Sequence, residues 1–184
     1  DYVWIANFYW ILYILSVGML AIVLIPGVGE VVNGARRWIN LGFTNFQPSE
    51  LAKIFLIIFF AKFIMVHEED LSSKRTILKA VILIVIPLVL IFEEPNLSTT
   101  ICTAALFCVL MYVGGLSYRF IGIVLLVTVP TAIILLSLIV QPDQQILDDY
   151  QQKRILAWLN PEEYASDEAY QQNNSVMAIG SGQL

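Results

Sequence analysis

Five long apolar runs constrain the fold of this chain more than any other feature of its sequence. A helix needs about 20 mostly apolar residues to cross a bilayer, and the five expected spans are residues 5–25, 48–66, 77–92, 97–113 and 120–140. Of the 184 residues, 58% are hydrophobic and 14% are charged, whereas roughly a quarter are charged in a typical soluble domain. The sequence therefore predicts an all-α polytopic membrane protein, with five transmembrane helices in one membrane domain over residues 1–184.

The polar segments between the expected spans form two groups on opposite sides of the membrane. One group contains 26–47, 93–96 and 141–174, and the other contains 67–76 and 114–119. Lysine and arginine favour the cytoplasmic side, but the two groups carry nearly equal numbers of them. The charge rule alone therefore does not orient the protein. If the cations of the first group serve a site, that group faces outward.

The long segment 141–174 contains a helical pattern of its own. Apolar residues recur at roughly helical spacing in QQILDDYQQKRILAWLNPEEY, with charged residues between them. This pattern is typical of a helix in the membrane interface, although an ordinary surface helix has the same spacing. A further apolar helix is expected over 175–184. Because the chain begins at Asp1 without a methionine and ends within that helix, we expect it to be a fragment.

Two classes of partner are excluded by composition and spacing. Cys102 and Cys108 lie six residues apart in an apolar run, and His67 is the single histidine, so no transition-metal site of His and Cys can be built. A metal site made of carboxylates stays open. The chain has no basic stripe, and its formal net charge is −5, so nucleic acid is not expected as a partner.

The stretch GARRWINLGFTNFQPSELAK, residues 34–53, places charge at the entrance of an apolar helix. Pro48 suits the first helical turn, and Glu50 suits the positive end of the helix dipole. Lys53 lies further in, where a charge costs up to about 3 kcal/mol at the middle of a span and less near its end. Glu50 and Lys53 are spaced i,i+3 and can pair. The pair either serves the structure alone or lines a polar cavity.

A second polar entrance, FEEPNLSTT at 92–100, has the same features. Capping of the following helix by Asn96 or Ser98 explains part of it. The expected topology brings both entrances and segment 141–174 to one membrane face. Such a face fits an amphiphile with an anionic head, because Arg37 and Arg154 can clamp phosphates. A nearby carboxylate can take a proton there.

These same motifs resemble the SEDS family (shape, elongation, division and sporulation proteins). NGARRWINLG followed by FQPSELAK is similar to the family signature between its third and fourth helices, and EEPNLSTT is similar to its (Glu/Gln)-Pro-Asp-Leu-Gly-Thr element. The segment from DYQQKRILAWLNPEEY to the end resembles the large external loop and the entry to the eighth helix. The resemblance implies helices three to seven of a ten-helix fold. QQNNSVMAIGSGQL is closer to the RodA-like elongation branch than to the division branch.

The resemblance also implies a function. Family members are multi-pass proteins of the bacterial cytoplasmic membrane that polymerise lipid II into glycan strands, usually with a class B penicillin-binding protein. The three polar clusters then face outward. The reaction needs a base and positive charge for the departing pyrophosphate, with or without a divalent cation such as Mg or Mn. The substrate-binding residues expected on this basis are Arg37, Trp38, Gln47, Ser49, Glu50, Lys53, Glu94 and Arg154.

The catalytic acid departs from the family pattern. Members carry an aspartate as Pro-x-x-Asp after the loop proline, and that position is Tyr164 when counted from Pro161. We therefore predict Asp167 as the base, with Glu163 in reserve. Asn96 and Ser98 replace an aspartate and a glycine of the second element, which weakens any role assigned to them.

Two other functions stay open on the sequence. A transporter or flippase of lipid-linked precursors also carries charges within its spans, although such sites lie near the midplane and the clusters here gather at one face. A non-catalytic scaffold for a penicillin-binding protein is the other alternative. The missing Pro-x-x-Asp acid supports it.

Overall fold

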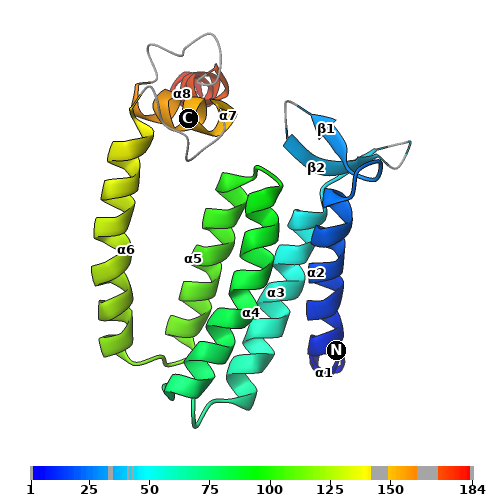
Figure 1. The fold of residues 1–184 in the computed structure, drawn as a ribbon, viewed down its shortest axis with the longest axis vertical. Coiled ribbons are helices and arrows are strands. Elements are labelled where there is room, and N and C mark those ends of the chain that lie inside the picture. Colours follow the sequence, from blue (N-terminus) through cyan, green and yellow to red (C-terminus); the bar gives the residue numbers. More distant parts are fainter. Residues whose placement is uncertain are drawn as a thin grey trace. The chain divides into compact units, whose positions relative to one another are not determined.

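The computed structural model describes residues 2–32, 35–40, 42, 44–141, 149–160 and 170–182 (Figure 1). Within them the chain is mostly helical, as predicted. The helices are α1 (Tyr2–Asn7), α2 (Tyr9–Leu24), α3 (Pro48–Val66), α4 (Lys74–Glu93), α5 (Leu97–Val113), α6 (Tyr118–Ile139), α7 (Asp149–Leu159) and α8 (Tyr170–Ser181). The strands are β1 (Glu30–Val32), β2 (Ala35–Asn40) and β3 (Asn45–Phe46).

Local chemistry sets where α3 and α5 begin. Pro48 occupies the first turn of α3, where its missing N–H has no intrahelical acceptor. Asn96 precedes α5, and its side-chain oxygen accepts a hydrogen bond from the Thr99 backbone N–H at 3.4 Å. The capping function considered for Asn96 is therefore confirmed. The apolar run 5–25, in contrast, is interrupted at Phe8, which separates α1 from α2.

One helix among the described residues, α4, has both the length and the apolar composition needed to cross a membrane. The apolar helices α2 and α5 are shorter than that standard, with 16 and 17 residues. Helix α3 has 19 residues but includes Glu50, Lys53 and Lys62. Two of these, Glu50 and Lys53, lie in its first two turns.

A small antiparallel sheet of order β1-β2-β3 occupies segment 26–47, which the sequence analysis treats as a loop. Val32 pairs with Ala35, so Asn33-Gly34 falls between the two paired strands. Asn-Gly between apolar residues is the strongest short hairpin signal, and β-branched and aromatic residues favour strands. Both signals are present here, and the prediction of a plain loop was wrong.

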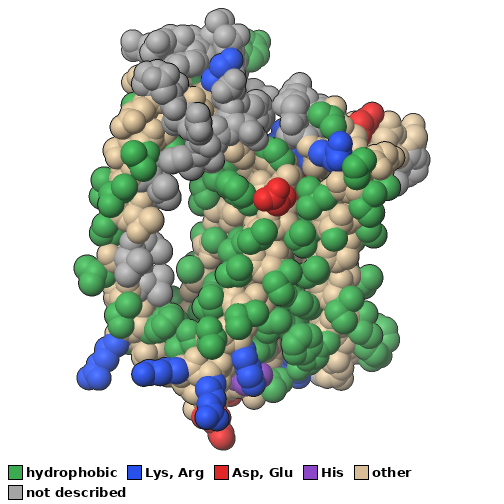
Figure 2. Space-filling view, in the orientation of Figure 1, with side chains coloured by type: hydrophobic (Ala, Val, Ile, Leu, Met, Phe, Trp, Pro, Cys, Tyr) green, Lys and Arg blue, Asp and Glu red, His purple; other side chains and the backbone are tan. Residues whose placement is uncertain are grey.

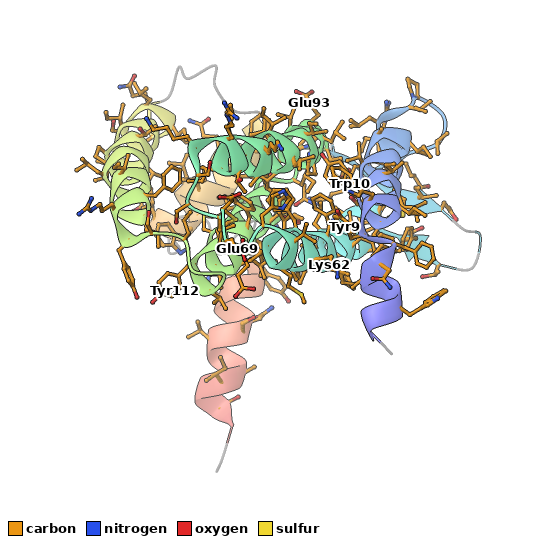
Figure 3. All side chains as sticks on the ribbon, turned by 90° about the horizontal axis from the view of Figure 1, so that it is seen from below. Tyr9, Trp10, Lys62, Glu69, Glu93 and Tyr112 are labelled. Atoms are coloured by element: carbon orange, nitrogen blue, oxygen red, sulfur yellow. The ribbon has the colours of Figure 1, made fainter. Side chains whose placement is uncertain are left out.

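The chain divides into two compact units, residues 1–125 and 126–184. In the first unit α2 packs on α3 and α4, while α5 packs on α3 and α4. Its core is aromatic: Phe59 is fully buried, and its ring lies 4.6 Å from Tyr13 and 5.6 Å from Tyr9. Figure 3 shows Tyr9 and Trp10 directed from α2 toward α3. In the second unit the Gln152 amide donates to the Ile139 carbonyl at 2.8 Å.

A proline in α4 explains a hydrogen bond between helices. Pro87 has no N–H, so the Leu83 carbonyl four residues earlier loses its intrahelical donor. The Tyr13 hydroxyl of α2 donates to this carbonyl at 2.9 Å. An unsatisfied carbonyl within a bilayer costs free energy, so this bond ties α2 to α4 at the position of Pro87.

We predict that Tyr13→Phe lowers the free energy of unfolding by about 1 kcal/mol. The loss should largely disappear in a Pro87→Ala background, because the alanine N–H can then satisfy the Leu83 carbonyl. The measurement is a double-mutant cycle on unfolding in detergent micelles. Equal effects of Tyr13→Phe in both backgrounds would contradict this account.

Candidate functional site

The candidate site lies at the end of the first unit where α3 and α5 begin and α4 ends. The three-stranded sheet lies at the same end (Figure 1), and β2 contacts both α2 and α3. Polar residues that are distant in sequence therefore meet in one region. This region contains Arg37, Trp38, Gln47, Ser49, Glu50, Lys53 and Glu94.

The first turns of α3 hold an ordered set of polar side chains. The Gln47 amide donates to the Ser49 hydroxyl at 3.1 Å, and Ser49 is buried. The Lys53 ammonium donates to the Glu50 carboxylate at 2.9 Å, so the predicted i,i+3 pair is confirmed. The Lys53 side chain is only 19% exposed, against 57% for Glu50. Its ammonium is therefore the more shielded charge of the pair.

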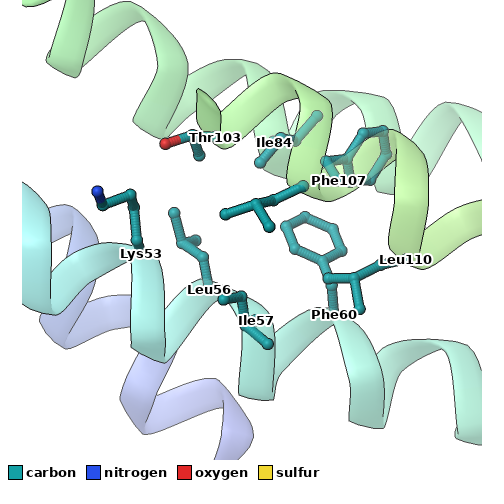
Figure 4. A pocket seen from close by; sticks show the side chains of 9 residues that line it. Lys53, Leu56, Ile57, Phe60, Ile84, Thr103, Phe107 and Leu110 are labelled. Atoms are coloured by element: carbon teal, nitrogen blue, oxygen red, sulfur yellow. The ribbon is translucent and has the colours of Figure 1, made fainter. Parts of the chain in front are cut away.

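Lys53 lines two hollows between α3 and α5. One is a narrow apolar pocket that Lys53 shares with Thr103, Phe107 and Leu110, among others (Figure 4). The other is an open groove of about 840 Å³, including space shared with solvent, lined by Phe46, Glu50, Leu51, Lys53, Ile54, Ile57, Cys102 and Leu106. The groove is charged at Glu50 and Lys53 and otherwise apolar. The groove thus combines one ion pair with an apolar wall.

The turn between α4 and α5 buries an acid. Glu94 follows α4 and is 0% exposed. Neither of its carboxyl oxygens has a hydrogen-bond partner among the described residues. Removal from water raises the pKa of Glu94 to about 8, and the nearby positive charge of Arg37 opposes this rise. At neutral pH the carboxyl is therefore mostly protonated.

The two arginines of β2 have different surroundings. One guanidinium nitrogen of Arg36 donates to the Leu24 carbonyl at 3.2 Å, at the C-terminal end of α2, where a cation is favourable. The Arg36 stem lies against Gly29, where an added Cβ would clash with it. Arg37 is the extra residue of a β-bulge in β2, because Glu30 pairs with Trp38 and Val31 pairs with Arg36. Arg36 thus fastens the sheet to α2, and Arg37 acts on Glu94.

The remaining predicted residues belong to other parts of the chain. Arg154 is exposed on α7, in the second unit. Asp167, Glu163 and Tyr164 lie outside the described residues. Cys102 lines the groove and Thr103 lines the narrow pocket, and neither was predicted as a site residue. Their signal was the run STTICT, which repeats small polar residues over two turns of α5.

The described residues hold no cluster of three or more His, Cys, Asp or Glu side chains that could bind a metal ion. A divalent cation such as Mg or Mn stays a prediction.

Comparison with known proteins decides the family. The model of the FtsW, RodA and SpoVE family, described as "Cell cycle protein", matches residues 4–184. The chain belongs to this family. It is the SEDS family that the motifs resemble.

Curated members of the FtsW/RodA/SpoVE family resemble the chain along nearly its whole length. It is 35% identical to the probable peptidoglycan glycosyltransferase FtsW of Nitrosomonas europaea over 176 residues, which are 93% of this chain and 42% of the relative. It is 33% identical to the peptidoglycan glycosyltransferase MrdB of Escherichia coli K12 over 175 residues, which are 95% of this chain and 45% of the relative. The chain thus spans less than half the length of these relatives. Because the identities to the FtsW and MrdB relatives are nearly equal, they do not assign the chain to the division branch or to the elongation branch.

Solved structures of the family resemble the fold of this chain. One, described as structural coordination of polymerization and crosslinking by a peptidoglycan synthase complex, matches with a TM-score of 0.69 and 31% identity. It covers 97% of this chain and 50% of that one. The crystal structure of the rod shape determining protein RodA of Thermus thermophilus matches with a TM-score of 0.55 and 31% identity, over 66% of this chain and 40% of that one.

Proposed function

We propose that the protein is a peptidoglycan glycosyltransferase that polymerises lipid II in the bacterial cytoplasmic membrane. The observation that carries the proposal is the membership in the FtsW/RodA/SpoVE family, whose relatives named above are peptidoglycan glycosyltransferases. The groove between α3 and α5 supports it, because a shielded cation at one end of an apolar wall suits a lipid with a pyrophosphate head.

The proposed reaction assigns separate tasks to the residues. The 4-hydroxyl of one sugar loses its proton to Asp167 and attacks the anomeric carbon of the other substrate. The bond from that carbon to the pyrophosphate oxygen breaks, and undecaprenyl pyrophosphate leaves. Lys53 and Arg37 stabilise the negative charge that develops on the leaving group. Arg154 is proposed to add to this stabilisation.

The proposed membrane arrangement places the site outside the cell. Helices α2 to α6 would each cross the bilayer, with the shorter helices accommodated by local thinning of the bilayer and by their neighbours.

Figure 2 shows Lys and Arg side chains gathered at the end of the first unit where α3 joins α4. Lys74 and Arg75 begin α4 there, as expected for a cytoplasmic end. The sheet and the first turns of α3, which contain Glu50 and Lys53 of the groove, lie at the opposite end (Figure 1). Helix α7 would lie in the outer interface.

A class B penicillin-binding protein is the proposed partner, supported by the likeness to a complex of polymerisation with crosslinking. One observation favours a scaffold function without catalysis, namely Tyr164 at the position where family members carry an aspartate. A scaffold would bind the partner equally well and produce no glycan.

The test uses the full-length protein with its penicillin-binding partner and purified lipid II. We expect glycan strands from the unaltered protein and none from Asp167→Asn, because the amide cannot accept the hydroxyl proton. Glu163→Gln serves as the matched control and should retain activity. Activity retained in Asp167→Asn but lost in Glu163→Gln would move the base to Glu163. Absence of polymer from the unaltered complex would favour the scaffold.

A further inference from the structure

We propose that Glu94 is a positioning residue whose proton sets how strongly the Arg37 guanidinium binds the pyrophosphate of a lipid-linked substrate. The inference rests on the proposed function, since it concerns anion binding in the same site. It replaces the direct substrate contact that the motif suggested for Glu94. A side chain that is 0% exposed has no surface to offer a substrate.

The position of Glu94 on α4 explains its burial. The buried face of this helix includes Ile84, Pro87 and Ile91, and Glu94 continues that series at the same helical spacing. Ile91 packs against Leu20 of α2 and Ala52 of α3. The neighbouring Glu93 is exposed and points away from the bundle (Figure 3). Two adjacent acids therefore have opposite environments.

Three features of this position favour the protonated carboxyl. It is removed from water, its oxygens have no hydrogen-bond donor among the described residues, and it lies at the negative end of the α4 dipole. Ionisation of a buried carboxyl that accepts no hydrogen bonds costs the full desolvation free energy of the charge. The geometry by itself thus argues against a permanent carboxylate.

Few groups near Glu94 can change its charge. Among the described residues, Arg37 of β2 is the charged group that acts on it. The layer of α2 and α3 beneath the last turn of α4 is apolar at Leu20 and Ala52. From α5 the buried Asn96 is uncharged. The electrostatic balance at Glu94 therefore depends on its own carboxyl and on the charge of Arg37.

Protonation of Glu94 changes what Arg37 can do. When the carboxyl is neutral, it does not offset the positive charge of Arg37, and a phosphate is attracted more strongly. When the carboxyl ionises, it competes with the phosphate for the same guanidinium. The pKa of about 8 places this change slightly above neutral pH. Anion binding should therefore weaken as the medium becomes alkaline.

The experiment measures the affinity of the full-length protein for inorganic pyrophosphate by calorimetry, between about pH 6.5 and about pH 9.5. We expect the affinity of the unaltered protein to fall roughly tenfold across this range. Glu94→Gln imitates the neutral acid and should hold the high affinity throughout. Glu93→Gln is the matched control and should titrate like the unaltered protein. Arg37→Gln should bind weakly at every pH, whereas Arg36→Gln should keep the pH dependence.

A structural readout accompanies the binding measurement. Because the pKa of Glu94 is raised from 4.5 to about 8 in the folded protein, its stabilising effect is complete below about pH 4.5 and is lost as the pH rises through about 8. The melting temperature of the unaltered protein should therefore fall with rising pH relative to that of Glu94→Gln. Isotope-edited infrared spectroscopy should detect a protonated carboxyl at neutral pH that is absent from Glu94→Gln.

The outcomes separate this inference from the proposed function. Equal pH dependence of pyrophosphate affinity in the unaltered protein and Glu94→Gln would overturn the inference while leaving the glycosyltransferase assignment intact. Absence of a protonated carboxyl signal at neutral pH would also overturn the inference and leave the glycosyltransferase assignment intact. Failure to bind pyrophosphate at any pH, together with absence of polymer from lipid II, would overturn both.

Discussion

Replacing Lys53 by methionine should reduce lipid II polymerisation roughly a hundredfold or more, because the departing pyrophosphate loses a preorganised positive charge. The fold should tolerate the change. Methionine keeps the length of the stem along the apolar wall, and Glu50 is exposed enough at 57% to be hydrated without its partner. The measurement is the initial rate of glycan synthesis by the full-length protein with its partner. Unchanged activity would mean that the Glu50–Lys53 pair serves the structure alone.

Two controls make the Lys53 result specific. Lys62→Met removes the same charge nine residues later on α3, where the side chain lies away from the groove, and it should leave the rate unchanged. Cys102 also lines the groove, whereas Cys108 does not line it, and both thiols are exposed. A bulky maleimide on Cys102 in a Cys108→Ser background should inhibit, and lipid II should slow its attachment. Equal inhibition from Cys108 alone in a Cys102→Ser background would contradict a groove-bound lipid.

The helices were largely predictable, because their ends have local causes. Pro48 and Asn96 begin α3 and α5 through interactions within one helical turn, and both are visible in the sequence. The same applies to the Glu50–Lys53 pair, whose partners are three residues apart. Interactions of this range do not depend on the rest of the fold.

The buried face of each helix was not predictable. In a soluble helix, apolar residues mark the side that faces the core. From Ala80 to Phe92 every residue of α4 is apolar, and exposed residues such as Val85 resemble buried ones such as Ile84. Within this stretch the periodicity of apolar residues therefore does not mark the buried face. Glu94 was predicted as a site residue from its motif, and the apolar pattern gave no sign that the fold exposes Glu93 and buries Glu94.

The sheet shows a different failure. Its hairpin signal, Asn33-Gly34 between Val32 and Ala35, was present but lay between long apolar runs that dominated the interpretation. The missed strand has a direct effect on the site. β2 carries Arg37 in a β-bulge, whereas Arg36 donates to the Leu24 carbonyl, and Arg37 is the arginine whose charge acts on Glu94. A loop gives no reason to distinguish the two.

Replacing Phe59 by alanine should lower the free energy of unfolding by about 3 kcal/mol or more. Phe59 is 0% exposed, and its ring contacts five other aromatic rings, those of Tyr9, Trp10, Tyr13, Phe60 and Phe63. Aromatic packing of this kind holds α2 to α3. Removing the ring leaves a cavity that the rigid neighbours cannot fill. The measurement is unfolding of the full-length protein in detergent micelles.

Phe92→Ala is the matched control for this prediction. Phe92 lies on α4 and is 41% exposed, so its ring exchanges protein contacts for lipid or detergent contacts at little cost. Its loss should change the unfolding free energy by about 0.5 kcal/mol or less. Comparable losses from both variants would show that the Phe59 cluster does not join the helices. We expect only Phe59→Ala to be destabilised, and its activity to fall in proportion to its folded fraction. The aromatic cluster would then support the groove without taking part in its chemistry.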